Sequence, residues 1–354
     1  MLMASPDTEV WLLIRADSAT ALAGRLKTLI DYWGWQDDQA RCNRVHGVAG
    51  DSTKPAFGLE PDAFERLAGC CTHIIHCAGT VRMNLALEDA RQSAVGSAEQ
   101  ILALARSMRK AGVLAKIDFV STVGVAGRRP GTLPEEWLDR PPAFHNTYEQ
   151  AKAEAEVLVR AALEDERLPI TVHRPSMVVG DSRDGRVIHF QIFYFLCEFL
   201  SGKQTLGLYP DFADFQLDLI PADVVAGAIL AASQDPSTVG RIFHLCSGPA
   251  LAPTIEEVKA LVRQAFVRHH LPVPGARSIP LRWYAGLARL GCRLAPADRR
   301  AALSTLPTYL DYLGERQSFG NAAFSHWAAT ALGRLPRWQD YVPRVLDYYL
   351  ARRH

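Results

Sequence analysis

Tyr148 and Lys152 are the two residues whose types and spacing best suit a chemical reaction. They stand four residues apart in HNTYEQAKAEAEVLVRAA, a pattern that predicts a helix over residues 147–163, so both side chains share one helical face. A nearby ammonium favours the phenolate and lowers a tyrosine pKa from its ordinary value of about 10 toward neutral pH. We therefore expect Tyr148 to act as a general acid or base. The alternative is a surface pair without a chemical role.

Two hydroxyl side chains, Ser121 and Thr122, stand at the end of a strand predicted over residues 117–121. The carboxyl end of a parallel strand delivers its side chains to the ligand crevice of an open α/β sheet. Either hydroxyl can donate a hydrogen bond to a reacting oxygen there. Ordinary turn capping is the alternative, but the nearby Tyr148 and Lys152 favour the chemical role.

The elements that must position these residues alternate between short apolar runs and longer helical patterns. This alternation is typical of βα units that build a parallel sheet. Strands are predicted over residues 10–14, 44–48, 73–77, 117–121, 170–173 and 241–246, and helices over 19–33, 85–111 and 147–163. The fold class is therefore α/β, a Rossmann-like parallel sheet with a smaller, mostly helical C-terminal lobe. The core covers residues 1–186, with 211–250 returning to it, and residues 187–210 and 251–354 form the substrate lobe.

Net charge, cysteine content and the apolar runs limit the kinds of molecule that we expect the protein to bind. The formal net charge of +1 offers no broad basic surface for nucleic acid, so we expect a small molecule instead. Seven cysteines are scattered without paired metal-ligand spacing, which indicates reduced thiols, no metal site and a cytoplasmic location. Residues 187–200 are apolar but short and interrupted by charge, so they predict a buried or interfacial helix, with membrane contact peripheral at most.

Five segments follow the order found in extended short-chain dehydrogenases/reductases: HIIHCAGTV, FVSTVGVAG, NTYEQAKAEAE, HRPSMVVGDSRDG and LDLIPADVVAGAI. More narrowly, the chain resembles the thioester-reductase and fatty acyl-CoA reductase branch, the male-sterility-type NAD-binding domain. GDSTKPAFGL, followed by HIIHCAG, carries this narrower resemblance. The resemblance covers about residues 9–250.

The resemblance assigns roles to individual residues. Tyr148 would protonate the substrate oxygen, Lys152 would hold the nicotinamide ribose and lower the tyrosine pKa, and Thr122 would be the hydroxyl donor, with Ser121 as the fallback. The remaining cofactor-binding residues follow from the same segments. Ala78 and Gly79 would line the ribose and phosphate path, Pro175, Ser176 and Met177 would form the turn beside the nicotinamide amide, and Asp51 would lie near the adenine.

Arg15 follows the first predicted strand, where the resembled family reads the adenosine ribose. A guanidinium suits a 2′-phosphate through forked, charge-assisted hydrogen bonds, so NADP (NADPH) is the expected cofactor. A solvated arginine is the alternative interpretation, and Asp17 is a competing acidic candidate.

The glycine-rich βα unit with which the resembled family opens is missing from this sequence. That unit places a Gly-x-x-Gly-x-x-Gly turn before a helix whose N-terminus receives the pyrophosphate. Gly47-x-x-Gly50 and Gly124-x-x-Gly127 are lone short spacings that predict turns, and Ser93 stands where many relatives carry asparagine. We expect an interrupted sheet with exposed strand edges and a weakened grip on the cofactor.

The resemblance implies NADPH-dependent reduction of an acyl thioester, acyl-CoA or carrier-bound, or of a related carbonyl. Thr122 and Tyr148 would stabilise the oxyanion while a thiolate leaves to give an aldehyde, with further reduction to the alcohol open. Two alternatives stay open. One is a truncated, non-catalytic relative that acts as a binding or scaffold module, and the other is a dehydrogenase or epimerase of another alcohol or sugar nucleotide. The oligomeric state stays unassigned.

Overall fold

The computed structural model describes residues 7–212, 215–280, 282–284, 286 and 317–353. The chain divides into two compact units, each described by itself below. The first contains residues 1–125, 146–174 and 227–243, and the second contains 126–145, 175–226 and 244–354. This division groups residues 126–145, 175–186, 211–226 and 244–250 with the C-terminal part, whereas the sequence analysis places them in the core.

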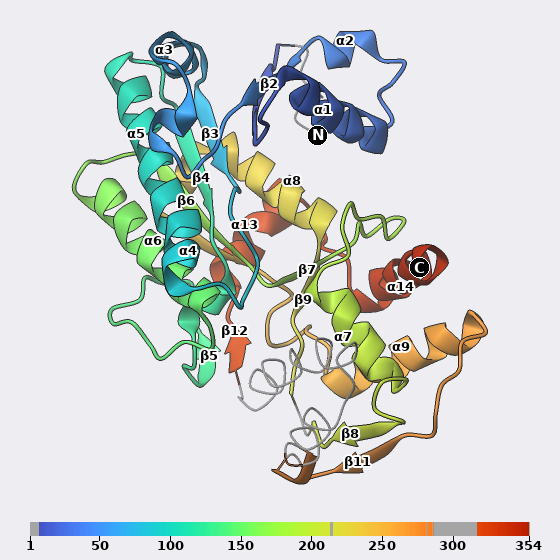
Figure 1. Ribbon diagram of the computed structural model, residues 1–354. Coiled ribbons are helices and arrows are strands. Elements are labelled where there is room, and N and C mark those ends of the chain that lie inside the picture. Colours follow the sequence, from blue (N-terminus) through green and yellow to red (C-terminus); the bar gives the residue numbers. More distant parts are fainter. Residues whose placement is uncertain (1–6, 213–214, 281, 285, 287–316, 354) are drawn as a thin grey trace. The chain divides into compact units, whose positions relative to one another are not determined.

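A four-stranded sheet forms the centre of the first unit (Figure 1). Its order is β10 (Ile242–Leu245), β6 (Ile170–Pro175), β4 (Lys116–Val120) and β3 (His73–His76), with β3 parallel to β4 and β4 parallel to β6. Side chains on successive strand positions are buried, among them Ile117, Phe119 and Val172. Burial along a whole strand is what a parallel sheet covered on both faces requires. The expected α/β fold with a parallel sheet is confirmed.

Helices packed on this sheet position the candidate site. They are α3 (Pro61–Cys70), α4 (Leu87–Arg91), α5 (Ser97–Lys110) and α6 (Thr147–Glu164), and α5 lies against both β3 and α6. The sequence predicts one continuous helix over residues 85–111. In the structure a π-helical turn, η3 (Gln92–Gly96), interrupts it between α4 and α5. Short 3₁₀ turns, η2 (Pro55–Gly58), η4 (Val123–Ala126) and η5 (Pro236–Thr238), complete the connections.

A separate strand pair precedes the four-stranded sheet. β1 (Val10–Ile14) and β2 (Val45–Ala49) are parallel and connected through α1 (Ala19–Trp33) and α2 (Gln39–Cys42). The sequence of β1 is entirely apolar, yet none of its side chains is buried, and α1 buries none either. Within the described residues, β1 pairs only with β2, and β3 is an edge of the four-stranded sheet. The parallel sheet is therefore interrupted, as the sequence predicts.

The two short glycine spacings named in the sequence analysis differ from each other in structure. Gly47 lies inside β2 and not in a turn, so the prediction of a turn from Gly47 to Gly50 is wrong at its first residue. Gly124 lies in η4, and Gly127 follows that turn with a φ of 52°, a left-handed conformation that favours glycine.

The second unit contains three parallel strand pairs and most of the C-terminal helices. β5 (Gly131–Leu133) pairs with β12 (Gln317–Phe319), β7 (Met177–Val179) with β9 (Leu219–Pro221), and β8 (Leu208–Pro210) with β11 (Arg277–Ile279). The helices are α7 (Ile192–Ser201), α8 (Ala222–Ser233, which continues into the first unit), α9 (Ile255–Arg268), α13 (Ala322–Ala331) and α14 (Trp338–Arg352).

The apolar run at residues 187–200 ends in a helix of the core. Helix α7 begins at Ile192, and Phe193, Cys197 and Leu200 are fully buried against residues of α9 and α14. Phe195 on the same helix is 62% exposed. Among the helices that the structure describes, none combines the length and hydropathy needed to cross a bilayer. This helix is therefore explained by packing inside the second unit.

The unburied surfaces of β1 and α1 generate a first prediction. We expect that a strand–glycine turn–helix segment of about 30 residues, joined before Glu9, raises the melting temperature by about 5 °C or more. The added strand would supply the hydrogen-bonding and apolar partner that β1 lacks in the described structure. Differential scanning calorimetry measures the change. A Gly/Ser extension of equal length is the control, and an equal rise with that extension contradicts the prediction.

Candidate active site

The side chains of Tyr148 and Thr122 lie close enough for the threonine hydroxyl to lower the pKa of the tyrosine. Tyr148 is the second residue of α6, whose start is fixed by Asn146, because its side chain accepts a hydrogen bond from Glu149 N at 3.0 Å. Thr122 follows β4, and its Oγ1 accepts a hydrogen bond from Gly124 N at 3.1 Å. The helix start and the strand end thus place two hydroxyl groups together, as the sequence analysis expects.

The pKa of the Tyr148 hydroxyl lies above its ordinary value. Burial raises it most, the hydrogen bond with Thr122 lowers it, and the charge of Glu149 raises it. The sequence analysis expects Lys152 to lower this pKa, and in the ligand-free structure that expectation is wrong. Tyr148 is consequently a protonated hydrogen-bond donor at neutral pH.

Lys152 lies one helical turn beyond Tyr148, on the same face of α6. Its Nζ donates a hydrogen bond to the carbonyl oxygen of Val120 at 3.1 Å, and the residue is only 6% exposed. Burial lowers the pKa of Lys152, against the attraction of Glu156 and Cys77, which raises it. An ammonium carries three donors, and in the described part of the chain this is its one hydrogen bond.

The turn after β3 lies next to this ammonium. A Cβ built on Gly79 would stand 3.6 Å from Lys152 Nζ, and Gly79 has a φ of 148°, in the range that favours glycine. The structure therefore brings the predicted residues Gly79 and Lys152 together. Because Gly79 has no side chain, the space next to the Lys152 ammonium stays open. The preceding Ala78 lies on the same turn.

Ser93 fixes this turn, a role that the sequence analysis does not assign to it. Thr80 N donates a hydrogen bond to Ser93 Oγ at 2.9 Å. Ser93 belongs to η3, the π-helical turn, and π-turns inside α-helices occur often at functional sites. The sequence analysis notes Ser93 only as a departure from the resembled family.

Ser121 is buried, and its hydroxyl has no hydrogen-bond partner among the described residues. Its backbone N–H donates to His173 O at 2.7 Å and so belongs to the sheet. Leaving a buried hydroxyl unpaired is unfavourable, so it suits a site that a ligand completes. Thr122, which lies close to Tyr148, is the better placed of the two predicted donors.

A buried ion pair supports the same face of α6. Arg174 donates to both carboxylate oxygens of Glu156, at 2.9 Å and 2.6 Å, and both residues are under 5% exposed. Glu156 follows Lys152 by four residues, so it lies on the Tyr148 and Lys152 face. Breaking a buried pair leaves an uncompensated charge, so this pair also fixes α6 against β6. Sequence reasoning did not find it.

Arg15 and Asp51 form an ion pair at the carboxyl ends of β1 and β2. Arg15 Nη2 lies 3.0 Å from Asp51 Oδ1, which also accepts hydrogen bonds from the backbone and hydroxyl of Thr53. Burial opposes ionisation of Asp51, but the hydrogen bonds from Thr53 and Arg15 outweigh it and lower its pKa. Arg15 is 67% exposed, so a ligand can reach its guanidinium. The competing Asp17 is also exposed.

Pro175, Ser176 and Met177 form the junction between β6 and β7. In the second unit, Ser176 Oγ donates a hydrogen bond to Asp218 Oδ1 at 2.7 Å, and Ser176 N donates to Leu245 O at 3.0 Å. Met177 begins β7 and pairs with Leu219 of β9. Asp218 is a residue that the sequence analysis did not single out.

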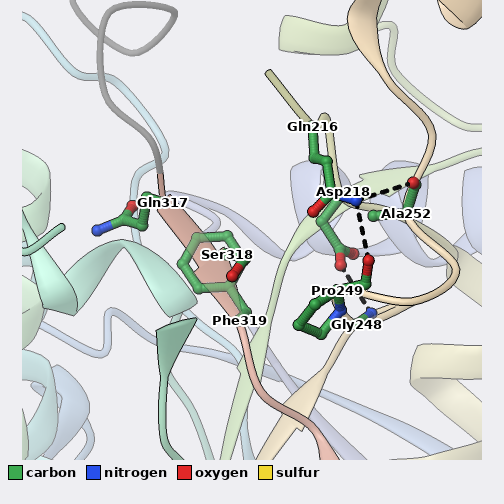
Figure 2. A pocket seen from close by; sticks show the side chains of 8 residues that line it. All are labelled: Gln216, Asp218, Gly248, Pro249, Ala252, Gln317, Ser318 and Phe319. Atoms are coloured by element: carbon green, nitrogen blue, oxygen red, sulfur yellow. Dashed lines mark hydrogen bonds between the residues drawn. The ribbon is translucent and has the colours of Figure 1, made fainter. Parts of the chain in front are cut away.

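A shallow hollow lies beside Asp218 in the same unit. Figure 2 shows the Asp218 carboxylate turned toward Gly248 and the Gln216 side chain hydrogen-bonded to the carbonyl oxygens of Pro249 and Ala252. Its volume is about 200 Å³ including space open to solvent, below the ~300 Å³ at which ligand pockets usually begin. The other lining residues are Gln317, Ser318 and Phe319. This hollow does not contain the tyrosine and lysine.

Comparisons with known proteins find a matching family model and several similar proteins. Residues 1–229 match the model of the NAD-binding family described as Male sterility protein. The chain is 30% identical over 236 residues to glycine betaine reductase ATRR of Emericella nidulans, which covers 65% of this chain and 18% of that protein. It is 28% identical over 273 residues to fatty acyl-CoA reductase 1 of Xenopus laevis, covering 66% and 50%. The chain thus spans half or less of these relatives.

Among solved structures, the chain is similar to the terminal R domain from the myxalamid PKS-NRPS biosynthetic pathway. The TM-score is 0.81 at 24% sequence identity, over 98% of this chain and 85% of that one. A dTDP-glucose 4,6-dehydratase from Streptomyces venezuelae is similar at a TM-score of 0.59 and 17% identity, over 99% and 89%. At these identities the two structures support the fold alone.

The raised pKa of Tyr148 generates a second prediction. We expect the difference in tyrosinate absorbance between the wild type and Tyr148→Phe to titrate above pH 10, because burial disfavours the phenolate. Because folding raises this pKa, the protonated Tyr148 hydroxyl contributes fully to the free energy of unfolding below about pH 10. That contribution is lost as pH rises through the folded pKa. The same difference measured in urea is the control, with a midpoint near 10. A folded midpoint below 10 contradicts this assignment.

Proposed function

The chain belongs to the NAD-binding family described as Male sterility protein, and on that premise we propose that it reduces an acyl thioester, or a related carbonyl, with NADPH. The observation that carries the proposal is the proximity of Tyr148 and Thr122, with a buried Lys152 one helical turn beyond the tyrosine. Two relatives support the choice of an acyl carbonyl, because their names describe a glycine betaine reductase and a fatty acyl-CoA reductase.

The cofactor-binding residues fit a dinucleotide at several points. In the first unit, Lys152 would hold the nicotinamide ribose, Ala78 and Gly79 would line its path, and the exposed Arg15 would bind the 2′-phosphate of the adenosine. Asp51, which is paired with Arg15, would hold that guanidinium near the adenine. Pro175, Ser176 and Met177 lie in the second unit and keep only the role that the resemblance gives them. The unpartnered Ser121 hydroxyl and the open approach at Gly79 support this fit.

Chemistry at the carbonyl follows from the two hydroxyl groups. When bound, NADPH supplies a hydride to the carbonyl carbon. Thr122 and Tyr148 donate hydrogen bonds to the carbonyl oxygen and stabilise the negative charge that develops there. The raised pKa of Tyr148 keeps its proton available for this role. The carbon–sulfur bond then breaks, the thiol leaves as a thiolate, and an aldehyde is the product.

Lys152 contributes position and charge and takes no part in the bond changes. Its hydrogen bond to Val120 O holds the ammonium at the end of β4, beside the strand end that carries Thr122. A fixed positive charge near the reacting oxygen lowers the energy of the oxyanion. We expect a substrate delivered on coenzyme A or on a carrier protein, in the cytoplasm.

A non-catalytic role is the second candidate, and one observation favours it. The part of the chain that carries Arg15 and Asp51 forms a sheet of only two strands among the described residues, and β1 and α1 contain no buried side chain. The helix that follows β1 opens at Ser18 and not at a glycine-rich turn, so its N-terminus lacks the close backbone approach that pyrophosphate requires. Binding of NADPH without turnover of any acyl thioester would favour this candidate.

The role of Tyr148 yields a third prediction. Tyr148→Phe is expected to abolish reduction of an acyl-CoA while it leaves NADPH affinity within a few fold, because only the ionisable hydroxyl is removed. Steady-state kinetics and cofactor titration measure the two effects. Lys152→Ala is the informative contrast, since it should weaken both binding and rate. Activity of Tyr148→Phe above about a tenth of the wild type would falsify the assignment.

The role of Arg15 yields a fourth prediction. Arg15→Ala should weaken NADPH by about 10-fold to 150-fold more than NADH, the range that 1.5 to 3 kcal/mol represents for hydrogen bonds to a charged group. Titration with each cofactor measures the ratio. Arg25→Ala, an exposed arginine on α1, is the matched control and should change neither affinity. Equal losses for NADPH and NADH would show that Arg15 does not read the 2′-phosphate.

A further inference from the structure

Cys70 and Cys71 place two thiols in contact at the end of α3, where the helix leads into β3 (Figure 1). Their Sγ atoms lie 3.9 Å apart, and either thiol can donate a weak hydrogen bond to the other. Cys70 is exposed and Cys71 is half-buried, so solvent reaches the pair. The proposed reduction of a carbonyl uses neither thiol.

The end of α3 explains why these adjacent side chains meet. Successive side chains on a helix point about 100° apart around its axis, and on a strand they point to opposite faces. Cys70 is the last residue of α3, whereas Cys71 is extended, with φ −81° and ψ 139°. The change from helical to extended backbone between the two residues sets their sulfurs in contact.

Hydrogen bonds on both sides of the pair fix this arrangement. Cys71 N donates to Leu67 O at 3.1 Å and so closes the last turn of α3. Thr72 O accepts from Ala115 N at 2.8 Å, which ties the next residue to the segment before β4. Because the backbone is held before and after the thiols, a ligand that binds both of them has little backbone to order.

The distance between the sulfurs suits one bridging atom better than a disulfide. A disulfide needs about 2.0 Å between its sulfurs and usually more than about 4.4 Å between its Cα atoms, which in adjacent residues are only about 3.8 Å apart. A single atom with two bonds of about 2.3 Å to sulfur, at an angle of about 95–109°, holds the sulfurs about 3.4–3.8 Å apart. The observed 3.9 Å is close to this second range.

The number of available ligands selects the bridging atom. Structural zinc takes four ligands, and the described part of the chain contains no group of three or more histidine, cysteine or acidic residues that could hold a metal ion. Trivalent arsenic that carries one organic group needs only two sulfurs to complete its bonds. We propose that Cys70 and Cys71 form a vicinal dithiol site that binds monosubstituted trivalent arsenicals.

Binding exchanges two oxygens on arsenic for two sulfurs, and nothing is oxidised. A compound R–As(OH)₂ and two thiols give R–As(S–Cys)₂ and two waters: As–O and S–H bonds break, As–S and O–H bonds form, and arsenic stays trivalent. The exposed Cys70 reacts first, and Cys71 then closes the ring. Burial and the neighbouring Cys70 raise the pKa of Cys71 to about 12, so Cys71 reacts as a thiol and its proton leaves with the water.

Titration of the reduced chain with phenylarsine oxide, which hydrates to the dihydroxy form, tests the site. We expect one tightly bound arsenical per chain by intact mass spectrometry, with the loss of two free thiols. Cys70→Ser and Cys71→Ser should each weaken binding by about 100-fold or more, because the second bond forms within one molecule. Cys42→Ser removes a half-buried thiol of the same unit and is the matched control, which should keep the wild-type affinity.

A second measurement separates a site set by the fold from the adjacency of two cysteines in any chain. The folded chain should bind phenylarsine oxide about 3-fold to 10-fold more tightly than the same chain unfolded in urea, because the fold already restricts both side chains. Urea below the unfolding transition is the solvent control. If Cys71→Ser does not fold, Cys70→Ser decides, because that side chain is exposed.

Each outcome bears on the inference without reference to turnover of a carbonyl. Loss of binding in folded Cys70→Ser, with Cys42→Ser unchanged and the folded chain favoured over the unfolded one, supports the dithiol site. Wild-type affinity in folded Cys70→Ser places the arsenical elsewhere and overturns the inference. Equal affinity of the folded and unfolded chains also overturns it, because the end of α3 would then contribute nothing to the site.

Discussion

The hydrogen bond from Lys152 to the carbonyl oxygen of Val120 is the contact on which the candidate site depends. It joins α6 to the end of β4, and these two elements carry Tyr148 and Thr122. Because the lysine is buried, its ammonium needs this acceptor and cannot exchange it for water at low free-energy cost. The spacing between the two hydroxyl groups is therefore set by a contact that neither of them makes.

Charge around this lysine is balanced over a short stretch of α6. Glu156 lies one helical turn from Lys152, but both of its carboxylate oxygens accept hydrogen bonds from Arg174. An arginine fork matches a carboxylate in geometry as well as charge, so Glu156 is fully engaged. Lys152 consequently donates its hydrogen bond to a backbone carbonyl instead of a carboxylate, while Glu156 attracts its charge without binding it.

The sequence predicted the contacts that a local pattern encodes. Tyr148 and Lys152 share a helical face because their spacing matches a helical turn, and the parallel strands follow from apolar runs between helices. It did not predict contacts between residues distant along the chain, such as Ser176 with Asp218 or Glu156 with Arg174, because neither pair has a periodic signal. The π-helical turn at Ser93 was also missed, since nothing in its residues distinguishes it from a continuous helix. The expected lowering of the Tyr148 pKa was wrong because burial raises that pKa, and the sequence does not show how deeply the hydroxyl is buried.

The isolation of β1, α1 and β2 has a consequence for how the adenosine end of a cofactor would be recognised. A segment with few buried side chains opens locally at a free energy well below that of global unfolding. Arg15 and Asp51, the groups that would read the adenosine, both lie on it. A ligand that contacts both groups would favour the closed segment over its locally opened form. Its affinity would therefore depend on the local stability of this segment as well as on the contacts of the guanidinium.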